Sequence, residues 1–287
     1  MAYPTIDNTS TTTSLNDLLP SIVAEAMFVA QERSIMRGLV RNYTLPAGSG
    51  KSVNVPIYPA ITAAAIGESV DLQNTQVSTN VAQLTVGEIG VMTTVTDLAR
   101  VASASNVIAD VGRLFGTAIA TKLDKDLLAL LSGFSANVGD TSTALSAATI
   151  FKAVAKLRAQ GVPMTDVVCV LSPWVAYDLK ANLTNTFANS NPTDVANEAL
   201  RMGFVGMLAG IPIYESANID NTGTTGDYVG GVFHRDALGL AMMQDLKIET
   251  QRDASLRADE LVATAVYGVG ELYDGYGVAI AADSSIL

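Results

Sequence analysis

The sequence has only one cysteine and one histidine among its 287 residues. The single cysteine, Cys169, excludes an internal disulfide and any zinc site built from clustered cysteines. The single histidine, His234, leaves a histidine-based metal site or proton relay without its usual partners. Cys169 also lies in an apolar run, which is typical of a small core residue rather than a reactive thiol. No catalytic constellation assembles, and we expect neither an enzyme nor a cofactor.

Charged residues are scarce as well, at 16% of the chain against 49% apolar residues. A low charge fraction in a soluble chain predicts that much of its surface is covered in the working protein, most simply by copies of itself. The 17 basic and 28 acidic residues give a net charge of −11. Because no part of the chain forms a basic platform, the composition argues against tight binding to nucleic-acid phosphates.

Long apolar runs are also absent. The sequence contains no stretch of about 18 apolar residues, the length that would predict a membrane-spanning helix. Its first residues lack the basic and then apolar pattern of a secretory signal. These two absences predict a cytosolic setting and no membrane partner.

Two glycine-containing stretches imitate nucleotide-binding loops. The stretch 48–52 reads GSGKS, but Leu45 stands where the full phosphate-binding pattern needs a glycine, and the following residues alternate as in a strand instead of opening a helix. Pro56 and Pro59 in that strand are tolerated only at a sheet edge. The stretch 268–270, GVG, lacks the third glycine of a dinucleotide loop. Neither stretch predicts a nucleotide site.

The strongest periodic signal is a helix over 106–131, about 39 Å long at ~1.5 Å per residue. Ser105 can cap its start, and the pair 132–133, Ser-Gly, can end it. One polar stripe recurs at spacings of three and four, namely Asp110, Arg113, Thr117, Thr121 and Asp124. The apolar face holds Ile108, Val111, Phe115 and Ile119, and after the interruption by Lys122 and Asp126 it passes to Leu123, Leu127, Leu130 and Leu131. The buried face is therefore expected to rotate along the helix, with its two ends packed on different neighbours.

Two features precede this helix at the start of the chain. Residues 1–15 are rich in serine and threonine, and they read either as a frayed terminus or as an arm that orders on a neighbour. Residues 16–40 read as a helix. Arg33, Arg37 and Arg41 recur every four residues and would share one face if the helix continues. That face is either solvated or a contact for the acidic surface of a neighbouring subunit.

A long hairpin is predicted over 45–97. Its two strand-like arms flank a tip of small and polar residues at 60–78, and Glu68 and Asp71 are the only charges in that tip. An isolated hairpin is marginally stable, and its edges invite pairing. We therefore expect a neighbouring subunit to support it. Glu68 and Asp71 are candidates to meet the three arginines of another copy.

After the long helix, the chain reads as a Gly/Ser/Thr linker at 133–144 followed by an α/β stretch. Helices are expected over 147–160, ended by Gly161, over 173–180, and from 193 or 194 to 202. A buried strand is expected at 167–171, with further strands at 211–214 and 228–233. Strand-like runs close the chain at 247–250, 261–269 and 276–281.

The order of these parts resembles the major capsid proteins of tailed bacteriophages, which have the Hong Kong 97 fold. The most family-like wording is GMLAGIPIYES at 206–216 and GVFHRDAL at 231–238. The resemblance implies an α+β fold with an N-terminal arm and helix at 1–44 and an extended loop at 45–97. It further implies a peripheral domain at 98–144 containing the spine helix 105–132, an axial domain at 145–246, and return strands to the peripheral domain at 247–287.

The resemblance also implies a function. Such a chain assembles with itself into hexamers and pentamers of an icosahedral shell around double-stranded DNA. It works with separate scaffolding and portal proteins and in some cases cement proteins, is made in the host bacterial cytoplasm, and ends in the virion. The net negative charge suits a DNA container, because a basic lining would trap the packaged phosphates.

Two alternatives remain open from sequence. An encapsulin-type bacterial nanocompartment shell protein has the same fold but holds protein cargo; the polar N-terminal arm and the long loop favour the phage capsid. A cytosolic α/β enzyme would use the stretch 48–52, and the strand-like residues after Ser52 argue against it.

Overall fold

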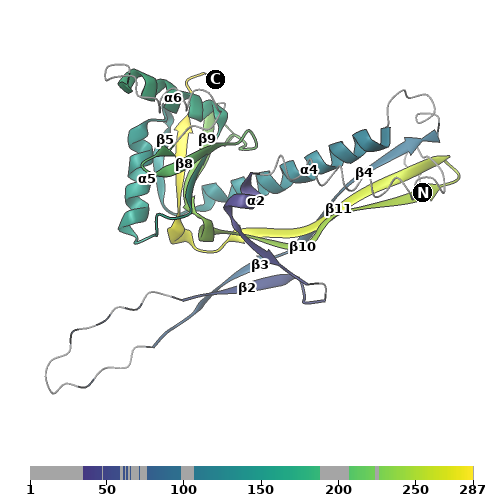
Figure 1. Cartoon of the computed structure of the whole chain (residues 1–287), viewed down its shortest axis with the longest axis horizontal. Helices are drawn as coiled ribbons and strands as arrows, with labels where there is room; N and C mark the ends of the chain where they lie inside the picture. The colour runs from purple at the N-terminus through teal and green to yellow at the C-terminus, as the bar shows by residue number, and fades with distance from the viewer. Residues whose placement is uncertain are drawn as a thin grey trace.

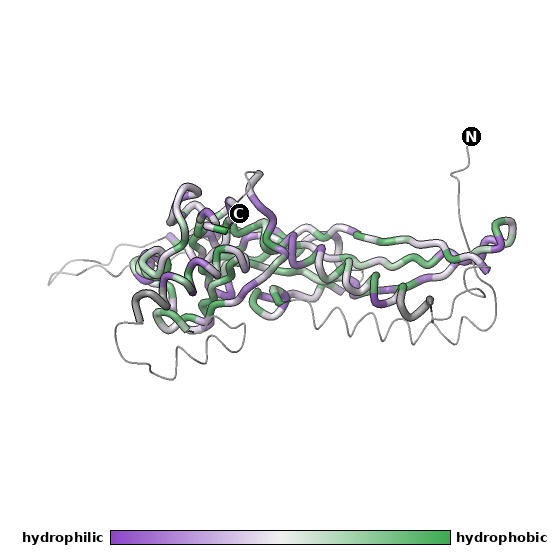
Figure 2. The backbone as a smooth tube through the Cα atoms, turned by 90° about the horizontal axis from the view of Figure 1, so that it is seen from above, coloured by the Kyte–Doolittle hydropathy of each residue, from purple (hydrophilic) through white to green (hydrophobic). Residues whose placement is uncertain are grey.

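The computed structural model describes residues 35–46, 48–58, 76–97, 107–187, 207–223 and 226–286, with the single positions 61, 63, 65 and 71. Within these residues the fold is mixed α+β. A four-stranded sheet runs beside a long helix, a six-stranded sheet forms a compact unit at one end, and a two-stranded hairpin projects away from both (Figure 1). Seen from above, the compact unit lies at one end and the long strands run side by side toward the other (Figure 2).

The elements of the first half, in chain order, are α2 (Met36–Leu39), β1 (Arg41–Thr44), β2 (Ser52–Ile57), β3 (Asn80–Thr85), β4 (Gly87–Thr96), α4 (Val107–Ala129), the 3-10 helix η1 (Leu130–Gly133) and β5 (Asn137–Ala144). Those of the second half are α5 (Ala147–Ala159), β6 (Val167–Leu171), α6 (Pro173–Phe187), β7 (Met207–Leu208), β8 (Ile211–Glu215), β9 (Asp227–His234), η2 (Arg235–Ala237), β10 (Leu238–Asp253), β11 (Ala258–Glu271), η3 (Asp274–Tyr276) and β12 (Gly277–Asp283).

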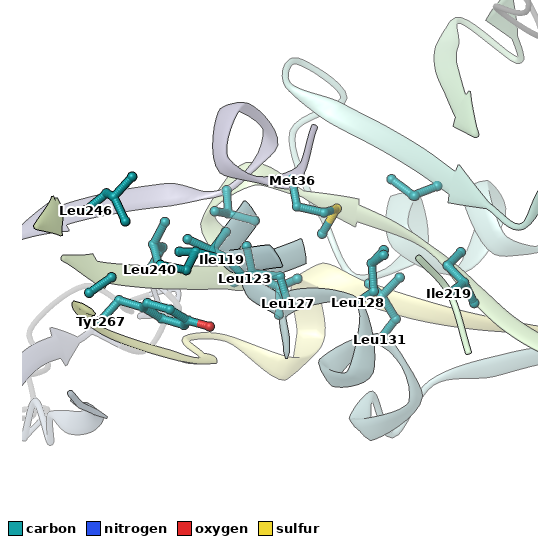
Figure 3. Packing of buried hydrophobic residues seen from close by; sticks show 14 of the residues in the cluster. Met36, Ile119, Leu123, Leu127, Leu128, Leu131, Ile219, Leu240, Leu246 and Tyr267 are labelled. Atoms are coloured by element: carbon teal, nitrogen blue, oxygen red, sulfur yellow. The ribbon is translucent and has the colours of Figure 1, made fainter. Parts of the chain in front are cut away.

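The long helix is present as α4 and η1, and its apolar face rotates as expected. The buried apolar residues that recur every four positions are Val111, Phe115, Ile119, Leu123, Leu127 and Leu131. Four residues turn an α-helix by about 400°, so the stripe turns by about 40° at each step. Along α4 the stripe faces β4, β10 and β11, whereas η1 contacts β9 and β12 of the other sheet. Figure 3 shows Ile119, Leu123, Leu127 and Leu131 in this core.

The polar stripe expected on α4 is wrong at Asp124. Its side chain is fully buried, whereas Arg113 is exposed. The Asp124 carboxylate accepts hydrogen bonds from the backbone N–H groups of Ile35 and Met36, both at 3.4 Å, and from the side-chain amide of Asn218 at 3.3 Å. Helical spacing alone does not show that two other segments approach the helix at this point.

The four-stranded sheet has the order β1-β10-β11-β4, with β1 parallel to β10 and the other pairs antiparallel. Shifts of register between Met242 and Lys247 interrupt the β10–β11 ladder. Alternate residues of β10 and β11 belong to the same core as α4, namely Leu238, Leu240, Ala263, Ala265 and Tyr267. The helix therefore covers one face of this sheet.

The hairpin is formed by β2 and β3, which pair antiparallel from Ser52 with Thr85 to Ile57 with Asn80. The expectation of one continuous second arm over 79–97 is wrong. The strand ends at Thr85, and 87–96 form β4, which pairs with β11. Strand periodicity continues through Val86, so the alternation of residues does not reveal that the partner strand changes there.

The six-stranded sheet has the order β5-β12-β9-β6-β8-β7 and forms a second core with α5 and α6. The expected helix over 147–160 is α5, and Gly161 follows it with a left-handed φ of +77°. The expected buried strand is β6, and Cys169 within it is fully buried. Helix α6 runs further than expected, to Phe187. Of the helix expected over 16–40, residues 16–34 lie outside the described residues, and the described part is helical as α2 and ends at Leu39. The helix expected from 193 or 194 to 202 lies outside the described residues.

Three expectations about strands are wrong. Most of the predicted linker 133–144 is the strand β5, parallel to β12. The last strand, β12, lies between β5 and β9 and so does not return to the sheet beside α4. The long strand β10 begins at Leu238 rather than at 247. The first two errors share a cause. Because β5 is a mostly exposed edge strand with glycine, serine and threonine, its sequence resembles a loop. Without β5 as a predicted strand, the sequence offered β12 no neighbour in this sheet.

The connection between the two sheets is packed and hydrogen-bonded. Phe134, just after η1, is only 4% exposed, and a Cβ at Gly277 would lie 2.2 Å from its ring. The N–H groups of Leu272 and Tyr273 both donate to the carbonyl of Ala237, at 2.8 and 3.3 Å. These contacts link three separate chain crossings, so the sheets are held in one arrangement.

Candidate assembly surfaces

The hairpin exposes large apolar side chains at its outer end. Tyr58 is 69% exposed, Ile61 60%, Val77 48% and Val81 59%. Within the described residues, β2 and β3 pair as strands only with each other. A two-stranded hairpin has no core of its own to bury these groups. Clustered exposed apolar groups are typical of an interaction surface.

Both larger parts of the molecule also expose isolated large apolar groups. The long part exposes Met92 on β4 and Leu114 on α4, and the compact unit exposes Phe151 on α5 and Trp174 and Tyr177 on α6. The side chains of Trp174 and Tyr177 are separated by three positions on one helix, so they share a face. These groups add to the surface that a neighbouring chain can cover.

The predicted row of arginines does not form a helix face. Helix α2 ends at Leu39, and Arg41 begins the strand β1. Arg37 pairs with Asp245 at 3.2 Å and Arg41 with Asp236 at 2.8 Å. The hydrogen bond and the charge of Asp236 raise the pKa of Arg41. The extended conformation of the residue before Arg41 breaks the helix, which spacing alone does not predict.

The other three predicted contact residues are Arg33, Glu68 and Asp71. Arg33 and Glu68 lie outside the described residues. Asp71 is exposed between the two hairpin strands. Within the described part, the structure thus places Arg37 and Arg41 beside the four-stranded sheet and Asp71 on the hairpin.

Asp124 is a positioning residue that the sequence analysis missed. Its carboxylate joins the start of α2 to the middle of the long helix and, through Asn218, to the loop before β9. Next to it, Lys125 pairs with Asp220 of the same loop at 2.6 Å. The signal in the sequence was an aspartate that directly follows Leu123 of the buried stripe.

His234 and Cys169, the two residues whose side chains could most readily take part in catalysis, have structural roles. Nδ1 of His234 accepts a hydrogen bond from the N–H of Asp236 at 3.1 Å and so caps the turn η2, while its ring makes an edge contact with Tyr276. Cys169 is fully buried, and desolvation raises the pKa of its thiol to about 12. A protonated and inaccessible thiol does not act as a nucleophile.

The stretch 48–52 is a turn and not a phosphate loop. Gly48 and Gly50 have left-handed φ angles of +89° and +92°, and the chain continues into the strand β2. In the part of the chain that the structure describes, no group of acidic, histidine or cysteine side chains could hold a metal ion. None of the described helices is both long and apolar enough to cross a membrane.

Several solved structures share this fold. The capsid of the cyanophage P-SCSP1u superposes with a TM-score of 0.70 at 18% identity, covering 88% of this chain and 89% of that chain. A structure from Mycobacterium phage Che8 gives 0.70 at 24% identity, covering 86% and 91%. The mature capsid of bacteriophage PhiM1 gives 0.65 at 17% identity, covering 87% of each chain. A comparison with curated proteins finds no match.

The family comparison is direct. A family model described as phage capsid protein matches residues 80–281, which is more than half of the chain. That range extends from β3 into β12, and it includes the long helix, the six-stranded sheet and three strands of the four-stranded sheet, β4, β10 and β11. The match favours neither the nanocompartment nor the enzyme alternative. The chain belongs to the phage capsid protein family and is a major capsid protein of a tailed bacteriophage.

Proposed function

We propose that this capsid protein assembles with copies of itself into hexamers and pentamers that close an icosahedral shell around double-stranded DNA. The observation that carries the proposal is the projecting hairpin with its exposed apolar end, on a chain of the phage capsid family. A shell multiplies each weak contact by its symmetry, so modest surfaces suffice for stable closure. The protein would be assembled in the host bacterial cytoplasm and end in the virion.

The fold would be arranged as in the Hong Kong 97 type. The helix α4 serves as the spine, the four-stranded sheet forms the peripheral domain with it, and the six-stranded sheet with α5 and α6 forms the axial domain. Compared with the division expected from sequence, β5 and β12 move to the axial domain, while β4 and all of β10 move to the peripheral domain. Of the arm expected over 1–44, β1 joins the four-stranded sheet, and the extended loop narrows to the hairpin of β2 and β3.

The hairpin would act between subunits. Its outer apolar groups need a surface to cover them, and Glu68 and Asp71 in its tip would meet Arg33, Arg37 or Arg41 of a neighbour. The present partners of Arg37 and Arg41 do not prevent this. Both pairs are exposed, with arginine side chains at 40% and 54%, and surface ion pairs contribute only about 0–1 kcal/mol. Exchange for a neighbour's carboxylate therefore costs little.

Other partners are separate proteins in this proposal. A scaffolding protein, a portal and in some phages a cement protein would complete the head. The DNA would be enclosed without sequence-specific contacts. With a net charge of −11, the shell does not hold the packaged phosphates tightly.

The test is electron microscopy and analytical ultracentrifugation of the purified full chain, alone and with a scaffolding protein from the same phage. We expect ring-shaped capsomers or closed particles. A chain that stays strictly monomeric at high concentration under both conditions contradicts the proposal. Nucleic acid in particles from phage-infected cells supports a head, whereas a protein cargo without DNA supports a nanocompartment.

A further inference from the structure

The connections of the four-stranded sheet force the hairpin to cross its face. The chain enters the hairpin from β1 at one edge of the sheet and leaves it into β4 at the other edge. The N–H of Leu45 still donates to the carbonyl of Met242 in β10, at 2.9 Å. At the other end, the N–H of Val86 donates to the carbonyl of Lys51 at 2.9 Å and closes the hairpin ladder. The root of the hairpin therefore lies over the two central strands, β10 and β11, as Figure 1 shows.

The central strands have almost no side chains where the root crosses. Gly239 of β10 pairs with Gly270 of β11, and Ala241 pairs with Gly268. Side chains alternate between the two faces of a strand, so these four positions share the face opposite α4. We call them the glycine floor. Leu84 of β3 belongs to the cluster on this face with Ala241 and is fully buried.

The contacts at the floor are too close for larger residues. A Cβ at Gly268 would lie 2.2 Å from the carbonyl oxygen of Thr85 and 3.0 Å from Cα of Val86, both of them backbone atoms. A Cβ at Gly270 would lie 2.7 Å from Cδ2 of Leu84, and one at Gly239 would lie 2.9 Å from its Cδ1. The overlap at Gly268 is with backbone atoms, whereas those at Gly270 and Gly239 are with side-chain atoms. Leu84 is met at both positions, and Leu272 is met at Gly239 as well, at 3.0 Å.

We propose that Gly268 and Leu84 are positioning residues for shell assembly, because together they determine the height and direction at which the hairpin leaves the sheet. Gly268 sets the distance between the backbones of β3 and β11, and Leu84 fills the space above the glycine floor and prevents tilting. The paired part alone is a lever of about 20 Å, at ~3.3 Å per residue for six residues. A small shift at the root is thus enlarged at the outer end. This inference rests on the proposed function, since the direction matters only if the outer end docks on a neighbour.

The first experiment compares Gly268→Ala with two controls. We expect Gly268→Ala to give a folded monomer with faster amide exchange in 80–85 and a particle yield near background. Gly87→Ala is the neutral control, because no atom lies within 4 Å of its added Cβ. It should match the wild type in amide exchange and in particle yield. Gly277→Ala is the control for general destabilisation. It disturbs Phe134 at the junction, so it should lower the melting temperature without changing exchange in the hairpin.

The second experiment uses the difference between the two kinds of overlap. Leu84→Ala alone should speed exchange in the hairpin and lower particle yield, because it empties the space above the glycine floor. Shortening Leu84 also removes the atoms that a methyl group at position 270 would meet, so Gly270→Ala should add no further loss to Leu84→Ala. Gly268→Ala should add its own loss to Leu84→Ala, because its overlap is with backbone. Gly270→Ala also keeps the inference testable if Gly268→Ala does not fold, because its overlap is milder.

Two results overturn the inference. The first is that Gly268→Ala forms particles with the same yield and diameter as the wild type. The other is a loss of melting temperature in Gly268→Ala, as in Gly277→Ala, with unchanged exchange in 80–85. Failure of the proposed function can be told apart from failure of this inference. If the proposed function fails, the wild-type protein forms no particles, but amide exchange in 80–85 of the monomer still differs between the variants.

Discussion

The phenol of Tyr267 on β11 donates a 2.8 Å hydrogen bond to the carboxylate of Asp126 on α4. Burial of the ring, together with the hydrogen bond and charge of Asp126, raises the pKa of this phenol. Asp126 also pairs with Lys122 one turn earlier, at 2.6 Å. The contact thus joins α4 to the four-stranded sheet at the part of the apolar face that Lys122 and Asp126 interrupt.

Replacement of this phenol tests the contact. Tyr267→Phe keeps the ring and removes one hydrogen bond to a charged group, so we expect a loss of about 1–2 kcal/mol in the free energy of unfolding. Urea unfolding of the monomer measures it. Tyr177→Phe, at an exposed tyrosine of α6, is the matched control and should change stability little. Equal stability of Tyr267→Phe and the wild type would mean that the hydrogen bond contributes nothing.

The face assignment of α4 is tested by two truncations two residues apart. Phe115 is only 3% exposed, so Phe115→Ala should cost roughly 3–5 kcal/mol of unfolding free energy. Thr117 is partly exposed, and its hydroxyl donates to the carbonyl of Arg113 of its own helix at 2.9 Å. Thr117→Ala should therefore cost little. Equal effects on unfolding would show that the assignment is wrong.

The acidic pair Glu271 and Asp274 at the junction predicts a dependence of stability on pH. Burial and the charge of Asp274 raise the pKa of Glu271. Burial acts to raise the pKa of Asp274 as well, but hydrogen bonds from Ser135 and Glu271 outweigh it, so that pKa is lowered. Glu271 thus stabilises the fold at low pH and loses that contribution as pH rises through its folded pKa. Asp274 contributes above its ordinary pKa and loses its contribution as pH falls.

Glu271→Gln separates the two contributions. Glutamine keeps a donor for Asp274 and removes the like charge, so the free energy of unfolding at pH 7 should rise, by less than about 1 kcal/mol because the site is partly exposed. The gain should vanish below the ordinary glutamate pKa of about 4.3. Ser135→Ala should do the opposite, lowering stability at pH 7 and less so at low pH. A gain for Glu271→Gln that is the same at pH 7 and pH 4 would contradict the assignment.

Periodicity predicted the elements that keep one regular pattern of buried residues along their length. The rotating stripe of α4, the buried strand β6 and the hairpin ladder of β2 and β3 all follow from the spacing of apolar residues. Periodicity did not reveal which strands are neighbours. The alternation is the same before and after Val86, although the partner changes from β2 to β11. It also cannot distinguish the exposed edge strand β5 from a linker.

The candidate surfaces were predicted less completely than the fold. The hairpin was predicted as an intersubunit element, but the glycine floor beneath it was noted only as a failed dinucleotide motif. The reason is physical. Gly268 and Gly270 are required by a chain segment that lies almost 200 positions earlier, and no local pattern reports such a contact. Asp124 was misplaced for the same reason, since its partners Ile35 and Asn218 are each about 90 residues away.

The charges of the hairpin tip give a prediction that depends on salt. Reversal of Glu68 and Asp71 to lysine should weaken assembly more at low salt than at high salt, because the Debye length is about 10 Å at 0.1 M and shrinks as salt is added. Light scattering during assembly measures the rate and yield. Joint charge reversal of Glu88 on β4 and Glu249 on β10, both exposed, changes the net charge by the same amount and is the control. A defect that is equal at every salt concentration would exclude an ion pair as its cause.

The most direct test of the account is deletion of the hairpin tip, residues 60–78, with monomer melting and particle yield measured side by side. The spine helix with its sheet and the compact unit each have their own buried core, so the monomer should stay folded and melt near the wild-type temperature. Particle yield should fall to background, because the lost contacts recur at every position of the shell. A deleted chain that assembles as well as the wild type, or a monomer that no longer folds, would contradict the intersubunit role of the hairpin.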